Sequence, residues 1–379
     1  MKIIILGAGL IGRPIALDLL INNEFKVTVA DYNPWVLEKI RAESNIKTIL
    51  IDLTLPENVT KLVSDYDMVV NALPGFLGYQ TLKAIIEAGK DAVDISFFPE
   101  DPQTLNELAL QNNVTIIHDM GVAPGMSNVL VGYAHHELDK TTSVKIFAGG
   151  LPKERVWPFE YKAVFSPIDV IEEYTRPTRL IKNGKHITVP ALSEREKIYI
   201  PGVGTLEAFN SDGLRSLLVN INADNMSEKT LRYPGHAEMM LVFRETGLFD
   251  KEEIEIEGIK ISPLQMTSRV LFPKWRMEDG DEDITVMRLE ISGIKNGENI
   301  NYLFTLHDTF HKKTGFHSMA RTTGYTATST VRLLKKGLFK EKGVIAPEFL
   351  GKNDRCVEFL LQELREKGVI YKEKTSKNL

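Results

Sequence analysis

Three glycines near the start of the chain have the spacing of a phosphate-binding turn. They form a G-x-G-x-x-G pattern over residues 7–12, between an apolar run at residues 3–6 and a helix-like segment. In such a turn the first glycine allows a tight bend, the second lets the backbone approach a pyrophosphate, and the third lets helix and strand pack closely. Free N–H groups at the start of the helix bind the anion. The alternative is a tight turn without a ligand. The pattern predicts a dinucleotide site with contacts from Gly7, Gly9, Leu10, Ile11 and Gly12.

The second apolar run ends in an acidic residue. Asp31 follows the glycines by about 20 residues, where a carboxylate accepts hydrogen bonds from the adenosine ribose. Its charge would repel the 2′-phosphate of NADP, so the sequence predicts NAD as the cofactor. Asp52, at the end of the third apolar run, is a further predicted cofactor contact. The alternative for Asp31 is a solvated carboxylate at a strand end.

Small and polar residues mark the ends of the later apolar runs. Residues 71–75 end the fourth run with the sequence NALPG, which either faces the nicotinamide ribose or forms a simple Pro-Gly turn. Asp94 and Ser96 end the fifth run, and Asp119 ends the sixth. Ligands of open α/β sheets bind at the carboxyl ends of the strands. The predicted cofactor contacts in these loops are Ala72, Leu73, Pro74, Gly121 and Pro124.

The predicted cofactor contacts can meet one ligand only if the fold places the ends of several strands side by side. Six apolar runs alternate with helical patterns, at residues 2–6, 25–31, 46–52, 67–73, 91–96 and 114–119. The alternation predicts an α/β fold with a Rossmann-type, doubly wound parallel sheet.

The pattern changes after residue 121. A helical pattern at residues 127–138 leads into longer apolar runs, and Asn296-Gly297 between two of them is a strong hairpin signal. We expect a second, α+β domain with a mixed or antiparallel sheet. Helical patterns at residues 320–336 and 354–367 are expected to return to the first domain, and residues 375–379 to form a frayed tail. The predicted domains are residues 1–125 plus about 316–379 for the dinucleotide and residues 126–315 for substrate binding and dimerisation.

Composition limits the class of protein. The 379 residues are enough for two cores, and a formal net charge of −5 gives no electrostatic footprint for nucleic acid. We therefore expect a small-molecule substrate. No apolar run is long enough to span a membrane and no signal-peptide pattern is seen, so a cytoplasmic location is expected. The one cysteine, Cys356, fits a reducing compartment. No metal is expected, because the eight histidines follow no metal-ligating pattern.

Several segments in order resemble one known family. They include DMGVAPGMSN at residues 119–128, GGLP at 149–152, TLRYPGH at 230–236 and MARTTGY at 319–325, besides residues 7–12, 30–31, 71–74 and 94–96. In these segments, nearly end to end, the chain resembles the lysine 6-dehydrogenases, which are close relatives of the glutamate-forming saccharopine dehydrogenases.

The resemblance implies an activity. It implies that NAD oxidises the ε-carbon of L-lysine, that ammonia is released, and that the aldehyde, allysine, cyclises to Δ1-piperideine-6-carboxylate. In saccharopine dehydrogenases the positions matching Ser96 and Arg232 meet the substrate, whereas the position matching Asp31 is not acidic and the cofactor carries a phosphate. Asp31 thus favours the lysine dehydrogenases. The resemblance also implies a homodimer that pairs through the second domain.

A free amino acid needs a cation for its carboxylate and acceptors for its amines. Arg232 and Arg215 are the predicted cations, with a surface ion pair as the alternative for each. Asp94 and Ser96 are predicted substrate contacts. The predicted groups for orienting the amine or water and for moving protons are Asp119, Tyr161 and His236, although a strand-end Asp or a helix-start His is often structural.

Two rival functions remain open at this point. One is a saccharopine or carboxynorspermidine dehydrogenase, which would take a larger secondary amine. The other is a regulatory module that senses NAD without turning it over. Substrate screening distinguishes the enzymes, and absence of NADH formation with any amine would favour the sensor.

Overall fold

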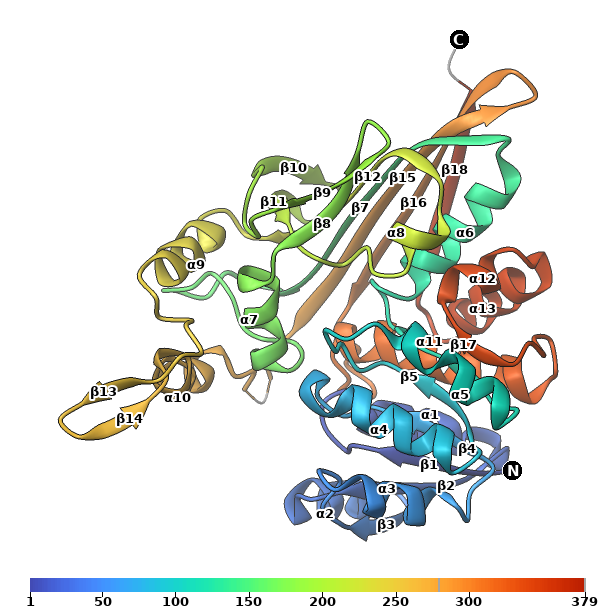
Figure 1. Ribbon diagram of the computed structural model, residues 1–379, viewed down its shortest axis with the longest axis vertical. Helices are drawn as coiled ribbons and strands as arrows, with labels where there is room; N and C mark the ends of the chain where they lie inside the picture. The colour runs from blue at the N-terminus through green and yellow to red at the C-terminus, as the bar shows by residue number, and fades with distance from the viewer. Residues whose placement is uncertain (279, 378–379) are drawn as a thin grey trace. The chain divides into compact units, whose positions relative to one another are not determined.

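The computed structural model describes residues 1–278 and 280–377, and their contacts form two compact units (Figure 1). Unit 1 contains Met1–His136 and Ala320–Ile370, and unit 2 contains Glu137–Met319 and the C-terminal residues from Tyr371. The domains expected from the sequence differ from these units at two elements. Helix α6 (Met126–Glu137) falls almost wholly in unit 1, and strand β18 (Tyr371–Lys377) falls in unit 2.

Unit 1 is built on a seven-stranded parallel sheet in the order β17-β6-β5-β4-β1-β2-β3. The strand order reverses between β1 and β4, which makes the carboxyl ends there the expected ligand site. The predicted doubly wound sheet is confirmed, and β17 is a strand that the sequence pattern did not indicate. The strands are β1 (Lys2–Leu6), β2 (Lys26–Asp31), β3 (Lys47–Leu50), β4 (Met68–Asn71), β5 (Asp91–Asp94), β6 (Thr115–Ile117) and β17 (Gly343–Ile345).

Helices cover this sheet because its central strands are apolar on both faces. All four apolar residues of β1 are fully buried, as expected for a parallel sheet that is shielded on both sides. Helices α3, α4 and α5 contribute buried aliphatic residues to the core on one face. The helices are α1 (Gly12–Leu20), α2 (Pro34–Glu43), α3 (Pro56–Val63), α4 (Gly75–Glu87), α5 (Asn106–Gln111), α6, α11 (Ser318–Lys335), α12 (Pro347–Gly351) and α13 (Asp354–Glu366).

Unit 2 contains a nine-stranded mixed sheet. Its main path is β10-β11-β12-β7-β15-β16-β18, with β8 paired to β12 and β9 paired to β8. Among the described residues of this sheet, β12 and β7 pair in parallel and the other pairs are antiparallel. The strands are β7 (Lys140–Pro152), β8 (Thr178–Lys182), β9 (Lys185–Val189), β10 (Glu196–Ile200), β11 (Gly204–Asn210), β12 (Ala223–Arg232), β15 (Asp283–Lys295), β16 (Glu298–Thr309) and β18.

The predicted hairpin forms as expected. Asn296 and Gly297 connect β15 to β16 with positive φ values of 52° and 78°, which a two-residue hairpin turn of this type requires. The predicted frayed tail is wrong for residues 375–377, because β18 pairs with β16 from Tyr371 to Lys377. The strand was missed because its side chains are mostly polar and its stability comes from backbone pairing. Residues 378 and 379 lie outside the described residues.

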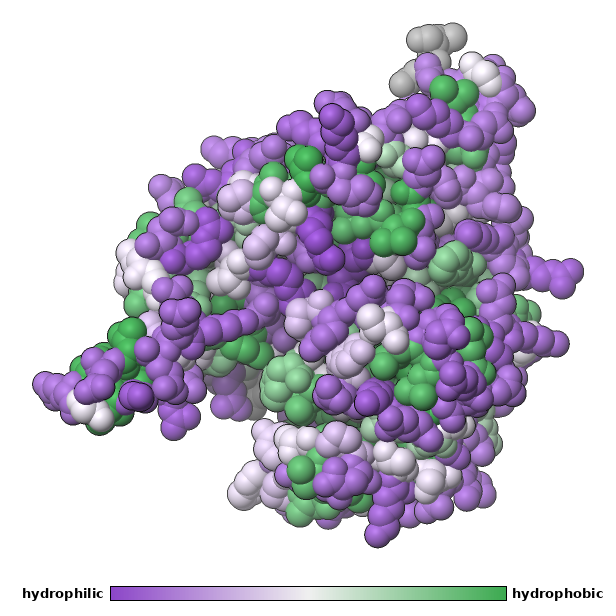
Figure 2. All heavy atoms as spheres, viewed as in Figure 1, coloured by the Kyte–Doolittle hydropathy of each residue, from purple (hydrophilic) through white to green (hydrophobic). Residues whose placement is uncertain are grey.

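Four helices and a small hairpin complete unit 2. Helices α7 (Pro167–Thr175), α9 (His236–Glu245) and α10 (Pro263–Trp275) share an aromatic-rich core, and α8 covers Leu217–Asn220. The hairpin of β13 (Ile254–Ile256) and β14 (Ile259–Ile261) extends away from this core (Figure 1). Figure 2 shows a face covered mostly by hydrophilic residues, with apolar residues on this hairpin.

The helices of residues 1–278 and 280–377 are all too short or too polar to cross a lipid bilayer.

Candidate functional site

The glycine turn after β1 has the geometry that its spacing predicted. Gly7 has φ of 99°, and a Cβ there would lie 2.6 Å from the carbonyl oxygen of Ala72. A Cβ on Gly12 would lie 2.0 Å from the carbonyl oxygen of Gly7, so strand and helix approach at backbone contact. A Cβ on Gly9 would meet nothing within 4 Å. The turn is therefore closed by Gly7 and Gly12 and open to a ligand at Gly9. Leu10 is half exposed and Ile11 precedes α1.

Asp31 lies beside this turn at the end of β2. Its Oδ2 accepts a hydrogen bond from the Ala8 N–H at 2.7 Å, and its Oδ1 accepts one from the Asn33 N–H at 2.8 Å. Each carboxylate oxygen keeps acceptor capacity for a ribose hydroxyl. Asp31 thus orders the glycine turn and presents a negative charge next to it.

Asp52 has a different, local role. It is exposed, and its Oδ1 accepts hydrogen bonds from the N–H and the hydroxyl of Thr54 at 2.9 and 2.7 Å. These bonds, led by the hydroxyl, lower the pKa of the Asp52 carboxyl. The geometry is that of a turn cap, and the predicted cofactor contact of Asp52 stays a prediction.

The ends of β4 and β5 bring four residues into one buried network. The Asn71 Nδ2 donates to Asp94 Oδ2 at 2.9 Å, and the Ser96 N–H donates to Asp94 Oδ1 at 2.6 Å. The Ser96 hydroxyl donates to the Leu73 carbonyl at 2.8 Å. Asp94 and Ser96 are therefore brought together with the predicted 72–74 loop, in which Pro74 precedes α4. Asn71, the first residue of the predicted 71–75 loop, was not listed as an individual contact, although it ends β4.

Asp119 sits next to this network in a strained conformation. Its φ is 53°, and its Oδ2 lies 3.1 Å from Nδ1 of His118, with both side chains buried. The His118 Nε2 is buried and has no hydrogen-bond partner among the described residues. His118 was missed in the sequence, although its position at the end of β6 was a usable signal. Gly121, whose N–H donates to the Asp119 carbonyl, forms an isolated bridge with Gly125 that encloses Pro124.

Burial dominates the electrostatics of this group. Burial of Asp94 raises the pKa of its carboxyl from 3.8 to about 7, and the negative charge of Asp119 adds to the effect. The bonds from Asn71 and Ser96 and the nearby His118 act in the opposite direction but do not cancel it. A carboxyl with a pKa near 7 can take up or release a proton at neutral pH.

In unit 2, Arg232 ends β12 as predicted but is already paired. Its guanidinium is 1% exposed, and Nη2 lies 2.5 Å from Glu173 Oε2 on α7. Nη1 donates to the Leu231 carbonyl at 2.9 Å, and the guanidinium lies over the Tyr161 ring, 4.7 Å from its centroid. Glu173 was not among the predicted site residues, because it lies 59 residues before Arg232 in the chain.

His236 is placed beside Arg232 but has no free nitrogen. Its Nδ1 lies 2.7 Å from the Phe159 carbonyl, which only accepts, so Nδ1 carries the proton. The Nε2 therefore accepts from the Tyr174 hydroxyl at 2.8 Å. Burial and the charge of Arg232 lower the pKa of His236 to about 3. Both ring nitrogens of His236 thus have partners in this structure, and its proton-transfer role stays a prediction.

Tyr161 and Arg215 complete the predicted set. Burial raises the pKa of the Tyr161 hydroxyl, and its proton-transfer role stays a prediction. That hydroxyl is buried with no partner among the described residues. Arg215 is also buried, with φ of 53°, in the turn that follows Gly213. The structure thus assembles the unit 1 residues at the strand ends and the unit 2 residues around Arg232.

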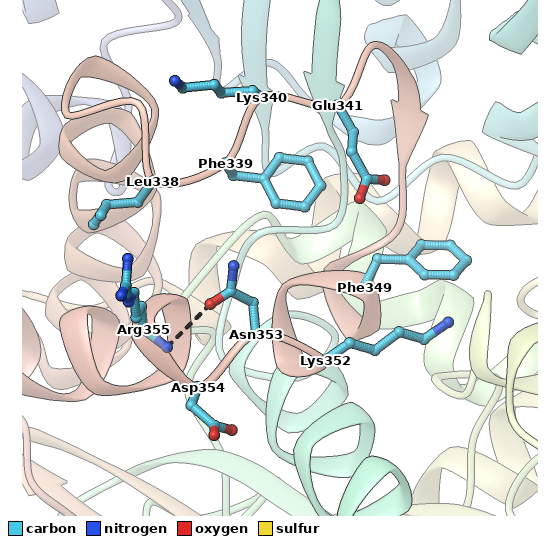
Figure 3. A pocket seen from close by; sticks show the side chains of 9 residues that line it. All are labelled: Leu338, Phe339, Lys340, Glu341, Phe349, Lys352, Asn353, Asp354 and Arg355. Atoms are coloured by element: carbon cyan, nitrogen blue, oxygen red, sulfur yellow. Dashed lines mark hydrogen bonds between the residues drawn. The ribbon is translucent and has the colours of Figure 1, made fainter.

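The structure also contains a cavity that is separate from the predicted site residues. A cavity of about 1010 Å³ in unit 1 is lined by residues 338–341, 349 and 352–355, none of which is a predicted site residue (Figure 3). Within residues 1–278 and 280–377, no group of three or more His, Cys, Asp or Glu side chains is arranged to hold a metal ion.

The fold and these residues define a two-unit α/β protein with a Rossmann-type nucleotide site. The family model described as the saccharopine dehydrogenase C-terminal domain matches residues 121–369. The model described as the saccharopine dehydrogenase NADP binding domain matches residues 3–117. The chain therefore belongs to the saccharopine dehydrogenase family, which confirms the resemblance at family level.

Curated relatives are similar over most of the chain. The chain is 23% identical to the saccharopine dehydrogenase (NADP(+), L-glutamate-forming) of Saccharomyces cerevisiae, with 99% of each protein covered. It is 23% identical to the carboxyaminopropylagmatine dehydrogenase of a Synechocystis species, with 92% of each covered. It is 22% identical to the mitochondrial alpha-aminoadipic semialdehyde synthase of Mus musculus, and it spans about half of that relative's length, with 98% of this chain and 47% of the synthase covered.

A solved structure shares the fold. The apo saccharopine dehydrogenase (L-Glu forming) of Saccharomyces cerevisiae superposes with a TM-score of 0.80 at 21% identity, covering 99% of both chains. This likeness confirms the predicted fold class.

The raised pKa of Asp94 predicts a pH dependence of stability. Because the folded state favours protonated Asp94, this residue contributes stability at low pH that is lost as pH rises from 3.8 to about 7. Asp94→Asn, which is always neutral, should lack this contribution to the pH dependence. The unfolding free energy of the wild type minus that of the variant, from urea titrations at several pH values, should fall as pH rises from 3.8 to about 7. A constant difference would show that Asp94 ionises normally.

Proposed function

We propose that the chain is an NAD-dependent oxidoreductase that deaminates the ε-amine of L-lysine. Lysine, NAD and water would give allysine, NADH, ammonium and a proton, and allysine would cyclise to Δ1-piperideine-6-carboxylate. The observation that carries the proposal is Asp31, a carboxylate at the ribose position beside the open glycine turn. It supports NAD, whereas the yeast saccharopine dehydrogenase is named for NADP(+) and the matching family model for NADP binding.

The residues of unit 1 suit nucleotide binding and proton transfer. The N–H groups of the glycine turn bind the pyrophosphate, and the strand-end loops bind the rest of the cofactor. When bound, the nicotinamide ring accepts a hydride. We assign Asp119 as the group that takes the proton from the substrate amine, with His118 bonded to it and Asp94 beside it.

The residues of unit 2 suit an amino acid. Arg232 is the cation for the carboxylate of lysine, which would share or replace the contact with Glu173. Arg215 is the second candidate cation. The family relationship also supports saccharopine as an alternative substrate, because relatives that cover this whole chain carry that name. A homodimer and a cytoplasmic location stay predictions.

Replacing Asp31 tests the cofactor. Asp31→Ser removes the charge that repels the 2′-phosphate, so the ratio of kcat/KM for NAD to that for NADP should fall by roughly tenfold or more. A ratio is insensitive to the fraction of folded enzyme. Glu38→Ser removes an acidic side chain from the exposed face of α2 and is the matched control, with no change expected. An unchanged ratio in Asp31→Ser would remove the basis for NAD.

A panel of amines tests the substrate. L-Lysine, saccharopine and carboxynorspermidine are each incubated with NAD or NADP while NADH or NADPH absorbance is followed. Lysine with NAD should react, and its rate should rise with pH because hydride leaves only from a neutral amine and the ε-amine pKa is about 10.4. Oxidation of saccharopine with NADP but not of lysine would establish the alternative, and a flat pH profile would contradict control by amine deprotonation.

A further inference from the structure

The strand that ends in Arg232 carries a buried acidic residue on the same face. Glu228, Thr230 and Arg232 are two residues apart in β12, so their side chains point to one side of the sheet. Glu228 is 6% exposed. Glu228 has no role in the site described above. Within the described part of the chain, its carboxyl group forms no ion pair with a Lys, Arg or His side chain.

One carboxylate oxygen of Glu228 is held and the other is not. Oε2 accepts hydrogen bonds from the Ser211 hydroxyl at 2.7 Å and the Gly213 N–H at 3.2 Å. The Thr230 hydroxyl in turn lies 2.8 Å from the Ser211 oxygen. A Cβ at Gly213 would lie 2.5 Å from the Glu228 carboxyl carbon, so the carboxyl group packs directly against the Gly213 backbone and would have to shift for a larger residue. In residues 1–278 and 280–377 no side chain or backbone group donates to Oε1.

The charged groups near Glu228 are acidic. Burial, together with the negative charges of Glu173 and Asp212, raises the pKa of its carboxyl to about 8 against the opposing hydrogen bonds from Ser211 and Gly213. Asp212 is neutralised by Arg179 at 2.7 Å, whereas Glu173 uses only Oε2 for Arg232. Asp169 adds negative charge next to Glu173. A cation near Glu228 and Glu173 would relieve this repulsion.

Two buried hydrogen-bond donors at Arg232 and next to it have no acceptor among the described residues. The Arg232 Nε and the Tyr161 hydroxyl are buried donors with no acceptor among the described residues. Buried polar atoms are normally paired, so such donors point to an absent acceptor. Among the described residues, this region of unit 2 therefore has buried donors without an acceptor and one carboxyl group, that of Glu228, without a cation partner.

We infer that Glu228, together with Glu173, binds the α-ammonium of the substrate while Arg232 binds its α-carboxylate. Unit 2 would then select α-amino acids in their zwitterionic form, over amines without a carboxylate and over acids without an α-amine. The inference rests on the proposed function and adds a specificity residue to it. It assigns Gly213, Ser211 and Thr230 as the groups that hold Glu228 in position.

Calorimetric titration of the full-length protein with NADH tests this assignment, because NADH prevents turnover. The probes are L-lysine, 6-aminohexanoate, which lacks only the α-ammonium, and cadaverine, which lacks only the carboxylate. The proteins are wild type, Glu228→Gln, and Glu290→Gln on β15 as a control on the same sheet. Wild type and control should bind lysine roughly 10- to 100-fold more tightly than 6-aminohexanoate.

Glu228→Gln should lose that preference selectively. Its lysine affinity should fall by roughly 10- to 100-fold, while 6-aminohexanoate affinity stays within about twofold. NADH affinity and thermal unfolding check that the variant folds. Glu228→Asp, which keeps the charge, should recover part of the preference. Equal losses for both probes, or an unchanged lysine affinity, would overturn the inference.

This inference and the proposed function fail separately. If lysine is oxidised but Glu228→Gln keeps the preference for lysine over 6-aminohexanoate, the inference is wrong and the function stands. If saccharopine rather than lysine binds, and Glu228→Gln weakens saccharopine selectively relative to its analogue without the lysyl α-ammonium, the lysine assignment is wrong and the inference stands.

Discussion

The buried ion pair between Arg232 and Glu173 organises the polar interior of unit 2. A guanidinium that is 1% exposed needs a counter-charge, because the desolvation penalty of an isolated buried charge is several kcal/mol. Glu173 on α7 supplies that charge, and Tyr161 supplies an aromatic face. Burial, together with the same positive charge, lowers the pKa of His236, and the neutral ring accepts the hydrogen bond from Tyr174. Arg232 thus orders the aromatic core around it, while its Nε has no hydrogen-bond partner within the described part of the chain.

Unit 1 uses burial in a related way. Asp94 is held by Asn71 and Ser96, yet its pKa remains near 7 because it is fully buried and close to Asp119. Each unit thus contains a buried carboxyl group with a raised pKa, Asp94 in unit 1 and Glu228 in unit 2. Both groups accept hydrogen bonds from neighbouring residues but form no ion pair with a lysine or arginine among the described residues. A carboxyl of this kind is suited to proton exchange in unit 1 and to binding a cationic group in unit 2.

The parts of the fold that the sequence predicted depend on local patterns. The glycine turn, Asp31 and the six parallel strands follow from spacing and alternation within about 30 residues, as does the Asn296-Gly297 hairpin. β18 was not predicted, because it has few apolar residues and is stabilised by pairing with the distant β16.

The site was predicted less completely, because its chemistry depends on distant partners. Glu173 lies 59 residues before Arg232, and Tyr174 lies 62 residues before His236. Sequence spacing identified Arg232 and His236 as polar residues near a strand end, but it could not show that the histidine would be neutral and fully bonded. Glu228 looked like an ordinary strand residue, since only the fold brings Ser211 and Gly213 to it.

The most direct test of the central claim follows the hydride itself. L-Lysine with deuterium on its ε-carbon is incubated with the protein and NAD, and the reduced cofactor and ammonia are measured by mass spectrometry and enzymatic assay. We predict one deuterium in each NADH formed and one ammonia released for each NADH. Reduced cofactor without deuterium, or no reduction of NAD by lysine at any pH, would contradict the account.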